Sequence, residues 1–126
     1  MKQILLVASG GAIGSIFRYL LSGWVLHQVA GWRFPLATFT INLTGCFMVG
    51  LLGALVVKHG YFSADTRLFL FTGIAGGFTT FSAFGLETFY LLRQGEVLVA
   101  GGYALASVVV GLLVLWLGFS MIPARG

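Results

Sequence analysis

Four apolar stretches, each long enough to cross a lipid bilayer, account for most of this 126-residue chain. They cover residues 4–29, 34–57, 68–92 and 97–122, and a helix needs roughly 20 residues to cross the hydrocarbon core. Only 8% of the residues are charged, so little polar sequence is left over for a soluble domain. We therefore predict an all-α membrane protein, with one four-helix transmembrane domain over residues 1–126.

The basic residues lie mostly at the ends of these stretches, where they are typical of anchors at the membrane interface. The net charge of +4 therefore does not indicate a nucleic-acid partner, and we expect none. Four helices place both termini and residues 58–67 on one side, with Lys2, Lys58, Arg67 and Arg125, against Arg33 and Arg93 on the other. This weak bias leaves both orientations open. A chain with no preferred orientation can pair with an inverted copy of itself.

Residues 73–85 interrupt the third stretch with the run Gly-Ile-Ala-Gly-Gly-Phe-Thr-Thr-Phe-Ser-Ala-Phe-Gly. Glycines weaken a helix, and irregular backbone is tolerated at membrane depth only where protein or an internal aqueous cavity satisfies its polar groups. We predict that the third helix is broken near its middle and that the break marks a functional site.

The second stretch carries a polar stripe, because Thr38, Asn42 and Cys46 recur every four residues and so share one helix face. Asn42 is the most informative member, since a carboxamide in hydrocarbon needs partners. Two roles suit it equally. Its amide hydrogens can donate to an anion, or it can link two helices, which contributes about 0.6 kcal/mol per hydrogen bond in membranes.

Aromatic rings and hydroxyls occur together after the glycines of the third stretch. Phenylalanine recurs every three residues, at Phe78, Phe81 and Phe84. Hydroxyl side chains are interleaved with these rings, at Thr79, Thr80 and Ser82. Such a ladder alone usually indicates packing, but the positive edges of aromatic rings also offer weak positive potential to a small anion. Glu87, near the end of this ladder, lies either at a pore mouth or in solvent.

Polar side chains also occur in the first and fourth stretches. Tyr103 and Ser107 lie four residues apart and place two hydroxyl donors on one face, although Tyr103 equally fits the aromatic belt at a membrane interface. Arg18 lies in the middle of the first stretch, where a charge costs roughly 2.5–3.5 kcal/mol. Three roles are open to it: snorkelling to an interface, capping helix carbonyls, or supplying a positive field that favours an anion.

No residue pattern in the chain indicates catalysis. The sequence contains no metal-ligand cluster, no Ser-His-Asp set and no phosphate-binding loop, and its only acidic residues are Asp65, Glu87 and Glu96. We therefore do not expect an enzyme. Neutral donors, aromatic edges and one embedded arginine fit a channel for a small anion, whose water shell must be replaced by hydrogen-bond donors. Because four helices scarcely enclose a pore, we expect an oligomer.

Three motifs occur in order along the chain: Gly-Gly-Ala-Ile-Gly-Ser-Ile-Phe-Arg-Tyr at 10–19, Thr-Ile-Asn-Leu-Thr-Gly at 40–45 and Gly-Gly-Phe-Thr-Thr-Phe-Ser-Ala-Phe-Gly at 76–85. Together they closely resemble the Fluc family of bacterial fluoride channels, over essentially the full length. The resemblance implies a passive, fluoride-selective channel that exports cytoplasmic fluoride across the bacterial inner membrane and so relieves fluoride toxicity. It also implies an antiparallel, dual-topology homodimer with two pores, each lined by both subunits.

The resemblance further implies roles for particular residues. The pore residues that we expect from it are Asn42, Phe81, Phe84, Ser82, Thr38, Tyr103 and Ser107. Backbone carbonyls of Gly76 and Thr79, contributed by both subunits, would hold a structural sodium ion at the centre of the dimer. Arg18 matches the arginine of the family's first helix, with an electrostatic or packing role.

Two other functions compete with the channel. A small dual-topology multidrug exporter has a similar size and helix number, but that class relies on a glutamate in its first helix, and no acidic residue precedes Asp65 here. A non-transporting membrane subunit would use the glycines and phenylalanines only for packing. Replacing Phe81 or Phe84 with isoleucine separates this second alternative from a channel, because the bulk is kept and the ring edge is removed.

Overall fold

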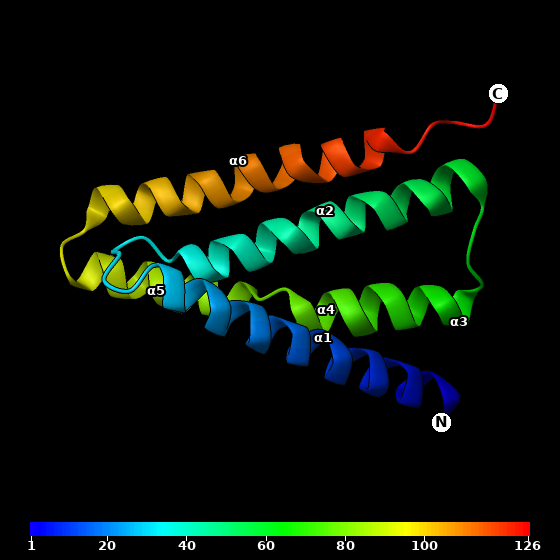
Figure 1. The fold of residues 1–126 in the computed structure, drawn as a ribbon, viewed down its shortest axis with the longest axis horizontal. Helices are drawn as coiled ribbons and strands as arrows, with labels where there is room; N and C mark the ends of the chain where they lie inside the picture. The colour runs from blue at the N-terminus through cyan, green and yellow to red at the C-terminus, as the bar shows by residue number, and fades with distance from the viewer.

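The computed structural model describes residues 1–126, and all of its regular elements are helices (Figure 1). Three spans are continuous helices, namely α1 (Lys2–Gln28), α2 (Leu36–His59) and α6 (Val97–Met121). The third span is divided into α3 (Ala64–Arg67), the π-helix η1 (Leu68–Ala75), α4 (Gly76–Phe78) and α5 (Phe81–Arg93). The structure confirms four apolar spans and a break within the third.

The third span begins earlier than the sequence predicted, at Ala64 rather than at residue 68. The reason is a local cap, because the hydroxyl of Ser63 accepts the N–H of Thr66 at 3.2 Å. Serine is among the preferred residues at this position. The polar residues of α3 thus form the first turn of the span instead of a loop.

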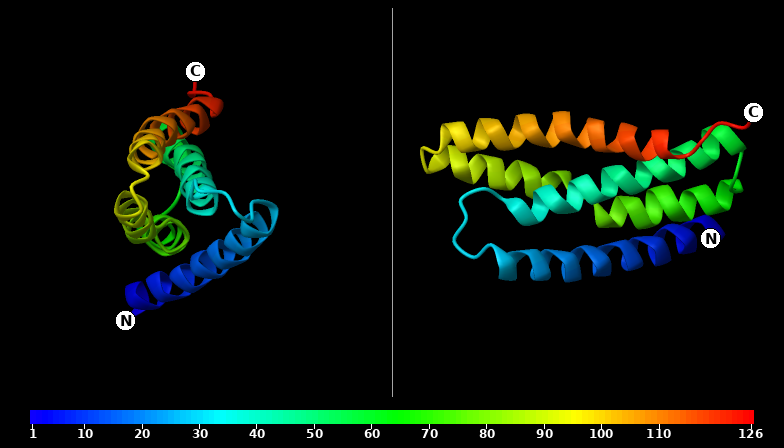
Figure 2. Two further views of the ribbon diagram at one scale, coloured as in Figure 1. Left: turned by 90° about the vertical axis from the view of Figure 1, so that its left-hand side faces the viewer. Right: turned by 45° about the horizontal axis from the view of Figure 1, so that its top comes forward.

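Helix α2 packs mainly against α6, whereas α1 packs against η1 and α4. Figures 1 and 2 show both termini and the turn before α3 at one end of the molecule, with the α1–α2 and α5–α6 connections at the other. One ion pair links elements at each end: Lys2 with Asp65, and Arg33 with Glu96. The basic side chains therefore divide between the two ends as the sequence predicted.

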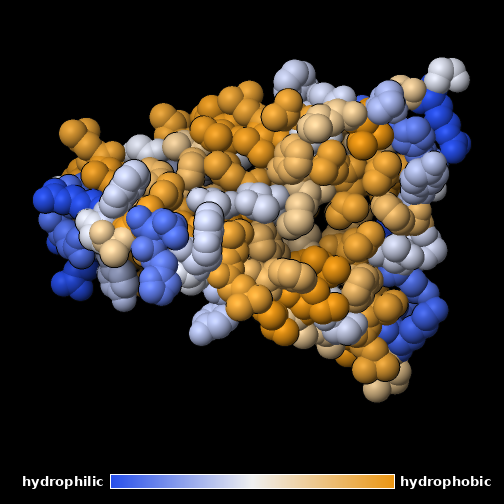
Figure 3. Space-filling model, in the orientation of Figure 1, coloured by the Kyte–Doolittle hydropathy of each residue, from blue (hydrophilic) through white to orange (hydrophobic).

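On the face shown in Figure 3, the surface between these ends is mostly apolar. Only 17 of 126 residues are buried, and large side chains such as Trp24, Leu105 and Trp116 are exposed along the spans. A water-soluble protein rarely exposes so large a continuous apolar surface. The chain is therefore a multi-pass membrane protein, whose helices face hydrocarbon or other protein.

Glycines bring α1 and the third span into backbone contact. A Cβ atom added at Gly10 would lie 2.7 Å from the carbonyl oxygen of Phe69, and one added at Gly77 would lie 2.9 Å from the Cα of Gly11. Small residues allow this close approach in membranes, where van der Waals packing is a main source of helix association. The α4 segment before the break is thereby fixed against α1.

Candidate functional site

The break in the third span consists of two extended residues. Thr79 has φ −79° and ψ 156°, and Thr80 has φ −146° and ψ 109°. Their hydroxyls bond to the helices on either side: Thr79 Oγ1 donates to the carbonyl of Ala75 at 2.9 Å, and Thr80 Oγ1 accepts the N–H of Ala83 at 3.3 Å. Thr80 therefore caps the start of α5, which stabilises a helix that begins at membrane depth.

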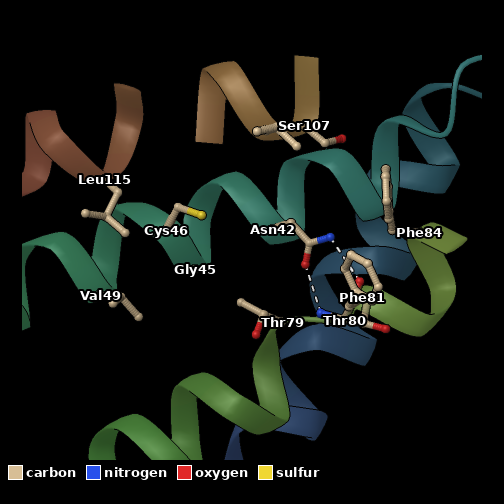
Figure 4. A pocket seen from close by; sticks show the side chains of 11 residues that line it. Asn42, Gly45, Cys46, Val49, Thr79, Thr80, Phe81, Phe84, Ser107 and Leu115 are labelled. Carbon is tan, nitrogen blue, oxygen red and sulfur yellow. Dashed lines mark hydrogen bonds between the residues drawn. The ribbon is translucent and has the colours of Figure 1, made fainter. Parts of the chain in front are cut away.

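The side chain of Asn42 on α2 holds the break from the opposite side. Its Oδ1 accepts the N–H of Thr80 at 2.8 Å, and its Nδ2 donates to the carbonyl of Thr80 at 3.0 Å (Figure 4). Both backbone groups of Thr80 are thus satisfied, as irregular backbone at this depth requires. Of the two roles open to Asn42, the link between helices is present, and one Nδ2 hydrogen remains for another acceptor.

The carbonyls of Gly76 and Thr79 are among those that lose their helical donors at the break. In a continuous α-helix the N–H of Thr80 would bond to the carbonyl of Gly76, and that of Ala83 to the carbonyl of Thr79. Here the first N–H goes to Asn42 and the second to the hydroxyl of Thr80. Gly76 and Thr79 are the residues expected to bind sodium, and free carbonyl oxygens of this kind fit a hard cation.

A pocket of about 370 Å³ lies beside the break (Figure 4). Its lining combines a carboxamide, hydroxyls and two aromatic rings, from Asn42, Thr79, Thr80, Phe81, Phe84 and Ser107. The rings of Phe81 and Phe84 have centroids 5.5 Å apart. Phe78 does not join them, because it is buried before the break. The three-residue repeat therefore does not form one continuous face.

A second polar cluster is centred on Glu87 of α5. Its carboxylate accepts the hydroxyl of Thr38 at 2.6 Å and that of Tyr103 at 2.8 Å. Tyr103 is fully buried and packs against the ring of Phe84, with centroids 5.1 Å apart. It is therefore not part of an interfacial aromatic belt. Glu87, for which the sequence left a pore mouth or solvent open, is instead partly buried and bonded to these two hydroxyls. Its position one turn after Phe84 was the available signal.

Arg18 lies near this second cluster. It lines a pocket of about 340 Å³ together with Thr38, Thr80 and Glu87. Arg18 precedes the end of α1 at Gln28 by ten residues, or about 15 Å along the helix axis.

Ser82 is exposed on α5 and lines neither pocket. The single chain therefore does not bring it together with the other expected pore residues.

The fold and this site define a small membrane protein with four spans, in which partly buried polar side chains gather at and beside a break in the third. The family model for CrcB-like protein, Camphor Resistance (CrcB), matches residues 5–119, and the chain belongs to this family. The family expected from the three motifs is confirmed by named relatives.

Three relatives illustrate the similarity, and each is named a fluoride-specific ion channel FluC. The one from Methylobacillus flagellatus is 57% identical over 97% of this chain and 95% of the relative. The one from Agrobacterium fabrum is 45% identical over 96% of each chain. The one from Chlorobium chlorochromatii is 45% identical over 98% of this chain and 92% of the relative.

Proposed function

We propose that the chain is a passive, fluoride-selective anion channel, whose residues 1–126 form one channel domain in the bacterial inner membrane. The observation that carries the proposal is the pocket beside the break, where two aromatic rings lie close to neutral hydrogen-bond donors. Relatives named as fluoride channels, similar over nearly the full chain, support the choice of ion.

The pocket residues suit a small, strongly hydrated anion. Asn42 retains one Nδ2 hydrogen, Ser107 offers a hydroxyl, and Phe81 and Phe84 present ring edges of positive potential. Together these groups replace part of the hydration shell without a fixed charge that would hold the ion. Thr38 and Tyr103 each donate their one hydroxyl hydrogen to Glu87. In this proposal they therefore position Glu87 rather than coordinate the anion, and Arg18, beside the same cluster, supplies the positive charge that attracts anions.

The conducting form in this proposal is a homodimer of inverted subunits with two pores. Phe81 is 83% exposed in the single chain, and Ser82 is exposed beside it, so a second subunit is needed to complete a pore around them. In each chain the carbonyls of Gly76 and Thr79 have lost their helical donors, so two chains would offer four such oxygens to a central sodium ion. Bound there, sodium would offset the partial negative charge of those carbonyls.

The physiological role follows from the chemistry of a weak acid. Neutral hydrogen fluoride crosses a bilayer from an acidic medium and ionises in the more alkaline cytoplasm, which traps fluoride there. A passive channel releases the trapped anion and so relieves its toxicity. Such a channel must reject chloride, because a general anion leak would depolarise the membrane.

The test is efflux from liposomes that contain the purified protein, measured for fluoride and separately for chloride with sodium present. We expect rapid release of fluoride and negligible release of chloride, as read by ion-selective electrodes. Release of neither ion from protein shown to be dimeric would overturn the proposal. Equal release of both would overturn the selectivity.

A further inference from the structure

Asn42 is the only side chain that bonds to both backbone groups of Thr80. Its carboxamide lies alongside the peptide groups of the break as a neighbouring β-strand would, accepting one N–H and donating to one carbonyl (Figure 4). Without it, Thr80 would expose a donor and an acceptor within the membrane, which is costly unless they find new partners. If α4 continued as a helix, the partner of this N–H would be the carbonyl of Gly76.

We propose that Asn42 is a positioning residue that builds the carbonyl site of the break. By accepting the N–H of Thr80, Asn42 stops α4 from continuing and keeps the carbonyl of Gly76 free. The hydroxyl of Thr80 does the same for the carbonyl of Thr79, since it takes the N–H of Ala83. Two side-chain acceptors thus take the two N–H groups that a continuous helix would direct to the carbonyls of Gly76 and Thr79. Their use for sodium rests on the proposed function, whereas the role of Asn42 in shaping the break does not.

The packing of α2 supports this role independently. Gly45 lies three residues after Asn42 on the same helix, and a Cβ atom at Gly45 would collide with Cγ2 of Thr79 and lie 3.5 Å from Cδ1 of Phe78. The missing side chain lets α2 approach the break closely. Asn42 reaches the backbone of Thr80 because of this approach, so the two residues of α2 act together.

The test measures the backbone of the break in full-length protein, in lipid nanodiscs and without fluoride. The readout is the ¹³Cα and ¹³Cβ chemical shifts of Thr79 and Thr80, which differ between extended and helical residues. We expect extended values in the unchanged protein, and a movement toward helical values at both residues in Asn42→Ala. We also expect the sodium concentration that half-saturates the Gly76 carbonyl shift to rise about tenfold in this variant, which corresponds to the loss of one hydrogen bond.

Cys46→Ala is the matched control, because Cys46 lines the same pocket one turn away but makes no hydrogen bond to the break. It should leave the shifts of Thr79 and Thr80 unchanged. If Asn42→Ala does not fold, Asn42→Leu, which has the same branching and is apolar, is measured with the same expectation. Unchanged extended shifts in a folded Asn42 variant would overturn the proposal, even if that variant had lost fluoride efflux, and would assign Asn42 to ion contact alone.

Discussion

The ring of Phe81 is largely exposed in the single chain and lies beside the extended backbone of Thr79 and Thr80. We predict that Phe81→Ile lowers the rate of fluoride efflux roughly tenfold or more. A tenfold decrease corresponds to an increase of about 1.4 kcal/mol in the free-energy barrier to conduction. Isoleucine keeps the bulk but has no positive edge to offer an anion. The measurement is initial efflux from liposomes loaded with fluoride.

Phe89→Ile is the control for this substitution. Phe89 belongs to the same helix and is also exposed, but it lines neither pocket. The rate of fluoride efflux through Phe89→Ile should stay near that of the unchanged protein. Both variants should elute at the same size in gel filtration. Equal losses of efflux in the two variants would indicate that α5 tolerates no change in packing, and would count against a special role for the Phe81 ring.

Glu87 shows how a single carboxylate can organise neighbouring hydroxyls. We predict that Glu87→Gln lowers the free energy of unfolding by about 1–3 kcal/mol, because glutamine has one oxygen for two hydroxyl donors and places an amide where the second oxygen was. One of the two hydroxyls must then accept from the amide instead of donating, and both bonds lose the contribution of the carboxylate's charge. Thermal unfolding in detergent, followed by circular dichroism, would measure the effect.

The comparison for Glu87 is Glu96→Gln, which removes an ion pair to a largely exposed Arg33. Surface ion pairs contribute about 0–1 kcal/mol to stability. The unfolding temperature of this variant should therefore be close to that of the unchanged protein. If the two substitutions lowered stability equally, the hydrogen bonds of Glu87 would contribute no more than a surface contact does.

At the residue scale, the sequence indicates which polar residues lie within the spans but not how they bond to one another. The spacing of Thr38, Asn42 and Cys46 indicated a polar face, and the position of Asn42 within a motif indicated that it mattered. The pairing of Asn42 with Thr80 and of Glu87 with two hydroxyls depends on which helices become neighbours. Periodicity within one helix does not contain that information.

Elements of this protein are placed by glycines as much as by apolar surface. We predict that Gly45→Ala destabilises the protein by about 1–3 kcal/mol, since the added methyl group overpacks the contact with Thr79. The substitution should also reduce fluoride efflux, because it pushes α2 away from the break. Thermal unfolding and liposome efflux would be measured on the same preparation.

Gly53→Ala tests whether this effect is local. Gly53 lies on the same helix, and a Cβ atom there would have its nearest neighbour, Cδ2 of Phe119, at 4.0 Å. Alanine favours a helix over glycine by up to about 1 kcal/mol, so this variant should be as stable as the unchanged protein or more so. A loss of stability at Gly53 equal to that at Gly45 would contradict the contact argument.

The spans were predictable because length and hydropathy decide them, and the break was predictable because glycine and hydroxyl residues interrupt a span. The π-helical form of η1 was not predictable. Its sequence, Leu68–Ala75, is apolar and contains one glycine, and nothing in it distinguishes an α-helix from a wider helix. The close contact of Gly10 with Phe69 and Gly73 exists only once α1 lies against this segment.

For the whole molecule, orientation in the membrane is decided by a small difference in charge. One end carries Lys2, Lys58, Arg67 and Arg125, and the other carries Arg33 and Arg93. Lys58 has a further task, because its Nζ donates to the carbonyls of Phe119 and Ile122 at 2.8 and 2.6 Å and caps the end of α6. Changes meant to alter orientation alone must therefore leave Lys58 in place.

We predict that two chains pinned in opposite orientations conduct only together. The first variant, Arg33→Gln with Arg93→Gln, keeps basic residues at one end only, so the positive-inside rule places that end in the cytoplasm. The second variant reverses the bias by five changes, Lys2→Gln, Arg67→Gln, Arg125→Gln, Gln28→Arg and Gln94→Arg. The variant Ala124→Cys, in a Cys46→Ser background, places a cysteine in the exposed C-terminal tail and reports the orientation through labelling by a membrane-impermeant thiol reagent.

Each pinned variant expressed alone should be labelled in one direction and should leave fluoride-exposed cells sensitive, because a subunit finds no inverted partner to complete its pore. Coexpression of the two should restore resistance and yield a complex that contains both chains. The unchanged protein should be labelled in about half of its copies, as expected when neither orientation is favoured. Full resistance from one variant alone, with labelling in a single direction, would show that parallel subunits suffice and would overturn the inverted dimer.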